Sequence, residues 1–400
     1  MSSFPVMARA LRRIPVALAL ATFCSACAAV HRPTATVQSL LAEAPRQAQQ
    51  DRITRDSIVE RLMRRVVRRG DRTLDVLLLS GGGQNGAFGA GFLRGWRARS
   101  DERMPTFDLV SGISTGALQS PYALLGTPAA IDTLTALYAR SATSIAPTVD
   151  WWFWLRRTGG LVNTARYDRT LAASINGQFR DDLRRAFADD RQIVFATTDF
   201  DLGIGRLWSL GDELDTTTAG LVRVRSLLRA ATAIPGIFPP VIIDGHVHAD
   251  GGVVENVMPV LERADYIRLG QRLASKGIAD VTVRVWVVMN MWTHAEPRAI
   301  TPSSRRQISS RSTSLLFYLH QSATLAGLEN LARAVSAEVP GVRMQVRVAT
   351  LPASESTSPG ADALFERRFM QRLDSIGFAR AQRAAPWDTV IGAFARPPFP

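Results

Sequence analysis

The stretch from Leu74 to Gly116 constrains the fold of this 400-residue chain more than any other part. It begins with an apolar run that ends at Ser80, continues into a glycine-rich loop, Gly81–Gly86, and then into a helix of small residues. An apolar run closed by a glycine cluster is typical of a buried parallel strand that leads into a helix N-terminus, where unpaired backbone N–H groups favour negative charge. The stretch therefore predicts a βαβ unit with an anion-binding loop.

The second half of this stretch predicts a nucleophile. The expected strand 107–111 leads into Gly112-Ile113-Ser114-Thr115-Gly116, a G-x-S-x-G motif. In such an elbow the tight strand-to-helix turn leaves room only for glycine on either side of the serine and exposes the serine oxygen. Small residues are common in tight turns, so this motif alone is a modest signal for a catalytic Ser114.

The glycine loop also fits a different class of site. Gly81, Gly83 and Gly86 form G-x-G-x-x-G, which is the fingerprint of dinucleotide-binding folds as well. Those folds place an acidic residue at the end of the second strand, where it binds the ribose. Here Asp108 lies near the start of that strand and Ser114 follows its end. The two motifs together therefore favour a hydrolase over a dinucleotide-dependent enzyme.

These residues resemble the patatin-like phospholipase family. The resemblance covers Leu74 to about Pro259 and rests on three ordered motifs, which are the glycine loop, the elbow and Asp250-Gly251-Gly252. The segment Ala231–Gly245 also looks like the family's approach to its catalytic aspartate. The chain departs from the family at Asn85, where a basic residue is common.

The resemblance implies an α/β fold, a three-layer α/β/α sandwich with a mainly parallel central sheet. It also implies a serine lipid acyl hydrolase, of phospholipase A or lysophospholipase type, with a Ser114–Asp250 dyad. The motif glycines would be Gly86, Gly112, Gly116, Gly251 and Gly252. No cofactor is expected, and the chain has no HExxH motif, no Cys/His ligand spacing and no EF-hand loop, so no metal site is predicted.

The base that activates Ser114 has two candidates. A serine hydroxyl needs a neighbouring base, and Asp250 could accept its proton if burial raised the pKa of the carboxyl toward neutrality. The alternative is an α/β-hydrolase triad in the order serine, acid, histidine. Only His294 and His320 follow both other residues in the chain, and nothing around them marks a catalytic loop. We therefore prefer the dyad.

The oxyanion donors are expected in the glycine loop. The backbone N–H groups of Gly82 and Gly83 are the main candidates, with Gly81 as their neighbour in the predicted oxyanion hole. One such donor can contribute roughly 10²–10³ in turnover. The alternative is a loop that needs glycine only for close strand–helix packing.

Residues 1–27 resemble a bacterial signal peptide of lipoprotein type. Arg12 and Arg13 precede an apolar segment, 14–23, and small residues precede Cys27. That segment is short for a permanent membrane span. We expect export and anchoring to the cell envelope, at the outer membrane, through lipidated Cys27. Ordinary cleavage that yields a periplasmic or secreted protein is the alternative.

The rest of the chain divides by composition. Residues 28–51 predict a tether, because they lack apolar periodicity. Residues 52–72 predict a basic amphipathic helix, which either rests on a membrane surface or packs on the domain with a solvated arginine face. Residues 73–295 would form the catalytic domain. Residues 296–400 would add a loop to about residue 312, a strand and helices that complete or cover it.

Charge and aromatic residues bear on partners. All but one of the 48 basic residues are arginines, and the formal net charge is +13, which suits contact with anionic lipid headgroups. Nucleic acid is not expected, since no recognition motif accompanies the charge. The aromatic cluster 151–157 fits a lid, a pocket wall or a membrane contact. The expected partners are a phospholipid or other acyl-ester lipid and a membrane surface; a non-enzymatic envelope lipoprotein is the alternative from another class.

Overall fold

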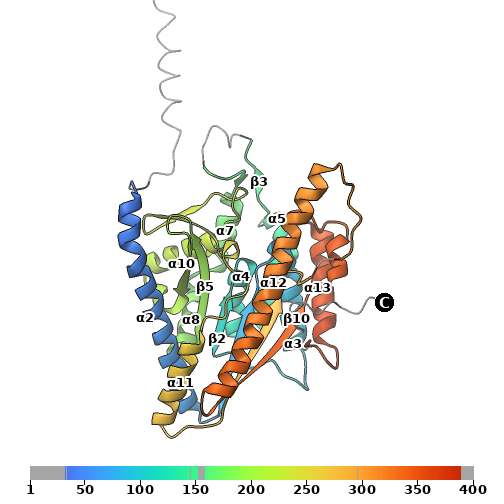
Figure 1. Ribbon diagram of the computed structural model, residues 1–400. Helices are drawn as coiled ribbons and strands as arrows, with labels where there is room; N and C mark the ends of the chain where they lie inside the picture. Colours follow the sequence, from blue (N-terminus) through green and yellow to red (C-terminus); the bar gives the residue numbers. More distant parts are fainter. Residues whose placement is uncertain (1–31, 33, 145, 152–157, 295, 389–400) are drawn as a thin grey trace, which may run out of the picture.

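The computed structural model describes residues 32, 34–144, 146–151, 158–294 and 296–388 (Figure 1). The predicted signal peptide, Cys27 and most of the aromatic cluster lie outside these residues. None of the helices in the described ranges has the length and apolar character needed to cross a bilayer.

The core of the fold is an eight-stranded mixed sheet in the order β10-β9-β1-β2-β5-β8-β7, with β6 paired to β5. The strands are β1 (Thr73–Leu79), β2 (Leu109–Gly112), β5 (Gln192–Asp199), β6 (Ile204–Ser209), β7 (Val241–Ile243), β8 (His246–Asp250), β9 (Val281–Met289) and β10 (Val342–Thr350). Neighbours from β10 to β5 are parallel, and β6, β7 and β8 are antiparallel to their neighbours. A separate hairpin joins β3 (Thr148–Val149) to β4 (Val162–Asn163).

Helices cover both faces of the sheet, and β1 shows why. Leu77 and Leu79 belong to one core cluster and Val76 and Leu78 to another, as the alternation of side chains along a strand requires. The first cluster includes residues of α3 (Gly86–Arg97), α4 (Thr115–Leu125), α5 (Pro128–Ser144), α7 (Ala165–Ser174), α8 (Gly177–Ala188), α10 (Thr218–Ala231) and α13 (Arg367–Ala381). The second includes residues of α2 (Val37–Arg69), α11 (Arg263–Ser275) and α12 (Arg305–Glu338). The predicted three-layer α/β/α fold with a mainly parallel sheet is confirmed.

The N-terminal segment differs from the prediction. Residues 37–51, which we expected to be part of a tether, are helical and continuous with the predicted basic helix. The Thr36 side chain accepts a hydrogen bond from Ser39 N–H in a capping box, and the helix ends at Gly70 in a left-handed conformation. Residues 37–51 are helical without apolar periodicity because the helix is capped at its N-terminus and continues into a C-terminal half that packs on the domain.

The arginines in the C-terminal half of α2 are ion-paired with the domain. The apolar residues Ile58 and Leu62 are buried in the core. On other faces, Arg65 pairs with the buried Asp108, and Arg64 pairs with Asp190 at 2.7 Å. This helix therefore packs on the domain. The interpretation that it rests on a membrane surface required these arginines to be free, and they are paired.

The C-terminal part of the chain completes the sheet. β10 pairs with β9 in parallel from Val342↔Val281 to Thr350↔Met289, and α13 packs against α3. Residues 305–312, which we expected in a loop, form the first turns of the 34-residue helix α12. The Ser304 side chain caps that helix by accepting a hydrogen bond from Gln307 N–H, so a segment rich in serine and arginine is helical.

Candidate active site

The elbow between β2 and α4 presents Ser114. The backbone of this residue has φ 52° and ψ −121°, a conformation that residues other than glycine rarely adopt. The flanking glycines are required by contact. A Cβ on Gly112 would lie 2.2 Å from Gly116 O, and a Cβ on Gly116 would lie 2.2 Å from Leu79 O. The turn therefore permits the strained serine only between two glycines.

Asp250 reaches Ser114 because β2 and β8 lie along the same side of β5. β2 pairs with β5 up to Gly112↔Phe195, and β8 pairs with β5 from Asp199↔His248 to Thr197↔Asp250. The opposite side of β5 is occupied by β6. The ends of β2 and β8 thus face each other, and Ser114 Oγ donates a 2.6 Å hydrogen bond to Asp250 Oδ2.

The surroundings of Asp250 set its acidity. The carboxylate is buried, and its second oxygen accepts a hydrogen bond from Gly252 N–H at 2.8 Å. Burial raises the pKa of Asp250 to about 6, while the hydrogen bonds from Ser114 and Gly252 oppose that rise. The group is therefore ionised at neutral pH but holds a proton more strongly than an exposed aspartate. Gly251, the other glycine of the motif, lacks room for a Cβ, which would lie 2.6 Å from Ala196 O.

The glycine loop divides into a structural and an open part. Gly81 N–H donates to Asn256 O at 3.0 Å, so this amide, which we had grouped with the oxyanion donors, already has an acceptor. No described residue accepts a hydrogen bond from the N–H groups of Gly82 or Gly83. A Cβ on Gly82 would lie 2.2 Å from Asn290 O, which explains the glycine there. Gly86 is equally confined, with its Cβ position 2.2 Å from Thr115 Oγ1.

Two asparagines that sequence reasoning missed hold this loop in place. Asn256 joins it to the segment after Asp250 through the bond from Gly81 N–H. Asn290 donates its side-chain N–H to Ser80 O at 3.0 Å and accepts from Gly89 N–H at 2.9 Å. Asn290 directly follows β9, and a polar residue at the carboxyl end of a buried strand is the signal that could have revealed it.

Asn85 stands where a basic residue is common in the family that the sequence resembles. Its side chain is buried, and its Oδ1 has no hydrogen-bond partner among the described residues. Its amide nitrogen lies 4.0 Å from Met291 Sδ. This position of the loop therefore supplies a neutral dipole in place of a positive charge.

Two cavities meet at Ser114. The first, of about 840 Å³ with its open mouth, lies among α4, α5, α7 and α10 and is lined mainly by apolar side chains, including Leu134, Leu137, Leu171 and Phe238. The second is lined by polar and apolar groups. Its lining includes Asp250, Asn85, Asn256, Met291, Trp292 and Phe317. Gly83 borders both cavities, so the open amides of the loop lie between them.

The histidines lie elsewhere. His294 is exposed, with Nδ1 3.3 Å from Thr293 Oγ1, and His320 is exposed on α12. His246 is hydrogen-bonded to Asp199 and His248 to Thr197. None of these four, the histidines that the structure describes, forms a hydrogen bond with Ser114. Burial lowers the pKa of His248 to about 4, so this ring is neutral at physiological pH.

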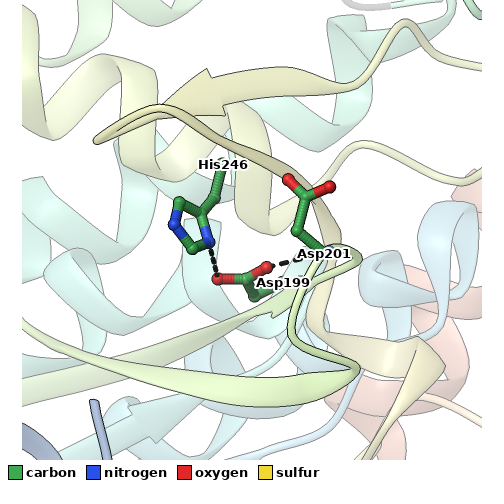
Figure 2. A group of neighbouring side chains, drawn as sticks. All are labelled: Asp199, Asp201 and His246. Carbon is green, nitrogen blue, oxygen red and sulfur yellow. Dashed lines mark hydrogen bonds and ion pairs between the residues drawn. The ribbon is translucent and has the colours of Figure 1, made fainter. Parts of the chain in front are cut away.

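A second polar cluster, Asp199, Asp201 and His246, has ligand atoms within 4.8 Å of one another (Figure 2). These atoms already have partners. Asp199 accepts from His246 Nδ1 at 2.8 Å and from the N–H of Asp201 at 3.0 Å, and Asp201 accepts from Val247 N–H and from Arg32. Hydrogen bonds and an arginine account for the cluster, which fixes β8, and with it Asp250, to the end of β5.

Comparisons with known proteins bear on this arrangement. Residues 77–262 match the family model described as patatin-like phospholipase, and that range contains Ser114, the glycine loop and Asp250. The chain is also similar to the crystal structure of VipD from Legionella pneumophila, with 13% sequence identity and a TM-score of 0.33 over 78% of this chain and 66% of that chain. The chain thus spans just under two thirds of the VipD chain. No curated protein matches it. The family match supports, in general terms, hydrolysis of acyl esters of lipids.

Proposed function

We propose that this chain is a patatin-like serine hydrolase that cleaves acyl esters of membrane phospholipids or lysophospholipids through an acyl-Ser114 intermediate. The observation that supports the proposal most strongly is the 2.6 Å hydrogen bond between Ser114 Oγ and Asp250 Oδ2. Ser114 borders a cavity lined mainly by apolar side chains, beside two amides that lack an acceptor among the described residues.

In the proposed first half-reaction, Asp250 accepts the proton of Ser114 as the serine oxygen attacks the ester carbonyl carbon. Gly82 N–H and Gly83 N–H then donate hydrogen bonds to the oxygen of the tetrahedral intermediate. As that intermediate collapses, Asp250 gives its proton to the leaving alkoxide, and the C–O bond breaks. An alcohol leaves, and the acyl group remains on Ser114.

The second half-reaction repeats these roles with water. Asp250 takes a proton from a water molecule, which attacks the acyl carbon. The proton returns to Ser114 Oγ as the acyl–oxygen bond breaks, and the fatty acid leaves. A base with a pKa of about 6 suits both directions of transfer near neutral pH, because it is ionised yet still basic.

The two cavities support an assignment of the two ends of the proposed substrate. The apolar cavity would hold the acyl chain, since Leu134, Leu137 and Leu171 offer no hydrogen bonds. The second cavity would receive the alcohol part, because Asn85 and Asn256 border it together with Asp250, the proton donor to that part. A phospholipid has this division into a long apolar chain and a polar leaving group.

We also propose export to the cell envelope through a lipidated Cys27, on the sequence of residues 1–27. Cys27→Ser should release the protein from the membrane fraction of its host and abolish incorporation of a labelled fatty acid. Retention in that fraction with unchanged labelling would reject the anchor.

The enzymatic proposal is tested with a fluorophosphonate probe, which labels activated serines. The wild-type protein should be labelled and should hydrolyse a soluble ester, and Ser114→Ala should do neither. Ser120→Ala is the matched control, because Ser120 is buried in α4 and, among the residues that the structure describes, its hydroxyl donates a hydrogen bond to Ala117 O alone. Its variant should keep both properties. Wild-type protein that resists the probe, or a labelled Ser114→Ala variant that keeps its fold, would contradict the proposal.

A further inference from the structure

The helix α12 is longer than the sheet that it covers. Its 34 residues correspond to about 50 Å at 1.5 Å per residue, whereas the nine residues of β10 correspond to about 30 Å. Its C-terminal half packs on the sheet through Leu325, Leu328 and Val335. The N-terminal half therefore extends past the carboxyl ends of the parallel strands, the edge that carries Ser114 (Figure 1).

The N-terminal half of α12 exposes large apolar side chains to solvent. Ile308, Leu315, Leu316 and Leu319, at spacings of i, i+7, i+8 and i+11, are 44%, 37%, 71% and 58% exposed. At 3.6 residues per turn these four residues, the α12 stripe, lie together on one face. The buried residues Tyr318, Gln321 and Leu325 project from a different face of the helix. A helix that only covered a protein core would be polar where the stripe lies.

Positive charge flanks the stripe. No acidic residue occurs from Pro297 to Leu328, while Arg298, Arg305, Arg306 and Arg311 do. Arg305 and Arg306 are exposed, and neither forms an ion pair with a described residue. Arg64 and Arg65 of α2, by contrast, are held by aspartates of the domain. The protruding end of α12 therefore combines exposed leucine with uncompensated arginine.

The helix that carries the stripe reaches the active-site cavity through another of its faces. Phe317, which lies between Leu316 and Tyr318, lines the second cavity together with Ser114 and Asp250. The hairpin β3–β4 lies at the same end of the molecule (Figure 1), and Trp151, just after β3, is 81% exposed. One residue of α12 thus lines the active-site cavity, and exposed apolar side chains of α12 and of the segment after β3 lie at the same end of the molecule.

We infer that the α12 stripe, with Arg305 and Arg306, is a docking surface for an anionic phospholipid bilayer. The inference rests on the proposed function, in that it supplies the surface from which a lipid substrate would enter. A convex helix end with leucines on one face and arginines at its border matches interfacial helices, whose apolar side chains enter the headgroup region while cations contact lipid phosphates.

The test measures how much protein sediments with lipid vesicles. The parent protein is the 400-residue chain with two substitutions: Ser114→Ala prevents hydrolysis of the lipid, and Cys27→Ser removes the proposed anchor. The parent should bind vesicles of three parts phosphatidylcholine to one part phosphatidylglycerol at least fivefold more tightly than pure phosphatidylcholine. Leu315→Ser/Leu316→Ser/Leu319→Ser should weaken binding to both vesicles at least tenfold, and Leu316→Ser alone about threefold. Arg305→Gln/Arg306→Gln should weaken binding to the anionic vesicles only.

Matched control variants alter the opposite edge of the sheet. Val67→Ser replaces a 46% exposed side chain near the end of α2, and Arg72→Gln/Arg343→Gln removes two charges beside the first residues of β1 and β10. Both should bind as the parent does. Circular dichroism and the thermal unfolding midpoint check that each variant is folded.

Several outcomes would overturn the inference. Parent-level binding by folded stripe variants would do so, and so would equal losses in the control variants. A parent that is dimeric, with a monomeric stripe variant and no vesicle binding by either, would assign the stripe to a second copy of the chain. Because Ser114 is replaced throughout, the result does not depend on hydrolysis. Failure of probe labelling would reject the proposed enzymatic activity but not the docking surface. Failure of vesicle binding would reject the docking surface but not the enzymatic activity.

Discussion

Ser114 and Asp250 are separated by 136 positions in the chain, yet their side chains share a 2.6 Å hydrogen bond. The relationship depends on β5, which pairs with β2 near its start and with β8 near its end along the same side. Two strand ends that meet in this way bring a strained serine and a buried carboxylate together without a histidine. The predictions below follow from that arrangement and from the helices around it.

Hydrolysis of a soluble ester should depend on one ionisation with a pKa of about 6, that of Asp250. The carboxyl acts as a base only when deprotonated, so kcat/KM should be constant above about pH 7 and fall about tenfold per unit well below pH 6. The measurement is kcat/KM between pH 4.5 and 8. A kcat/KM that stays nearly constant down to pH 4.5 would show that the pKa of the carboxyl is not raised.

Asp250→Asn should abolish turnover and make the protein more stable at pH 8. The pKa of this carboxyl is about 6 in the folded protein and 3.8 in an unfolded chain, so between these pH values the folded state binds more protons than the unfolded state. The wild-type protein therefore loses stability as pH rises from about 4 to 6, by about 3 kcal/mol at most, and the variant does not. Urea unfolding at pH 4 and pH 8 measures the difference. A variant less stable than wild type at pH 8 contradicts the burial argument.

His294→Ala and His320→Ala should each retain turnover within about twofold, since both side chains are exposed and surface changes rarely exceed about 0.5 kcal/mol. Steady-state hydrolysis of the same soluble ester is the measurement. Collapse of turnover with either variant would favour a serine–acid–histidine triad and require that residue to move to Ser114.

Leu137→Trp should shift substrate preference toward short acyl chains. Leu137 is partly buried on α5 and lines the apolar cavity, so a larger side chain would occupy space meant for the chain. The ratio of kcat/KM for decanoyl to butyryl esters should fall roughly tenfold or more, as expected when two or three methylene groups are excluded. Leu125→Trp is the control, because Leu125 is also partly buried but does not line this cavity. Equal ratios for both variants would place the acyl chain elsewhere.

Arg65→Met should destabilise the fold by about 3–5 kcal/mol, because it leaves the buried charge of Asp108 without its most buried partner. The Arg65 side chain is 3% exposed and that of Asp108 is fully buried, where it also accepts a hydrogen bond from Asp75 N–H. Arg68→Met is the control. Its side chain is 47% exposed and bonded to Asp189, so it should cost no more than about 1 kcal/mol. Urea unfolding at pH 7 compares them, and similar losses would mean that burial does not distinguish the two pairs.

Local patterns were enough to predict the elbow and its neighbours. Gly112, Ser114 and Gly116 occur within five residues, and the turn that they form leaves no space for a side chain at either glycine. The motif alone therefore predicts the geometry of the turn. Asp250 was located through its motif, although its contact with Ser114 depends on pairings that no local pattern contains. Asn256 and Asn290 were missed because each acts on the glycine loop from a distant segment.

Helix ends and surfaces were harder to predict. Residues 37–51 and 305–312 lack apolar periodicity, yet each begins a long helix whose later turns pack on the sheet. The arginines of α2 could equally have faced a membrane, and only the position of Asp108 and Asp190 shows that they face the domain. A charged face in a sequence does not reveal its partners, because ion pairs join residues far apart in the chain.

The sequence by itself determined the βαβ unit and the turn that carries the serine, because these follow from hydrophobic runs and glycines that act over a few residues. The class of fold was predicted from the family resemblance of the motifs. The tertiary structure alone decided which groups surround that serine. In the folded chain the Gly81 N–H donates to Asn256 O, whereas the N–H groups of Gly82 and Gly83 have no acceptor among the described residues. Asp250 is buried, and the α12 stripe is exposed to solvent. Burial and hydrogen-bond partners come from strands and helices that meet only in the folded chain.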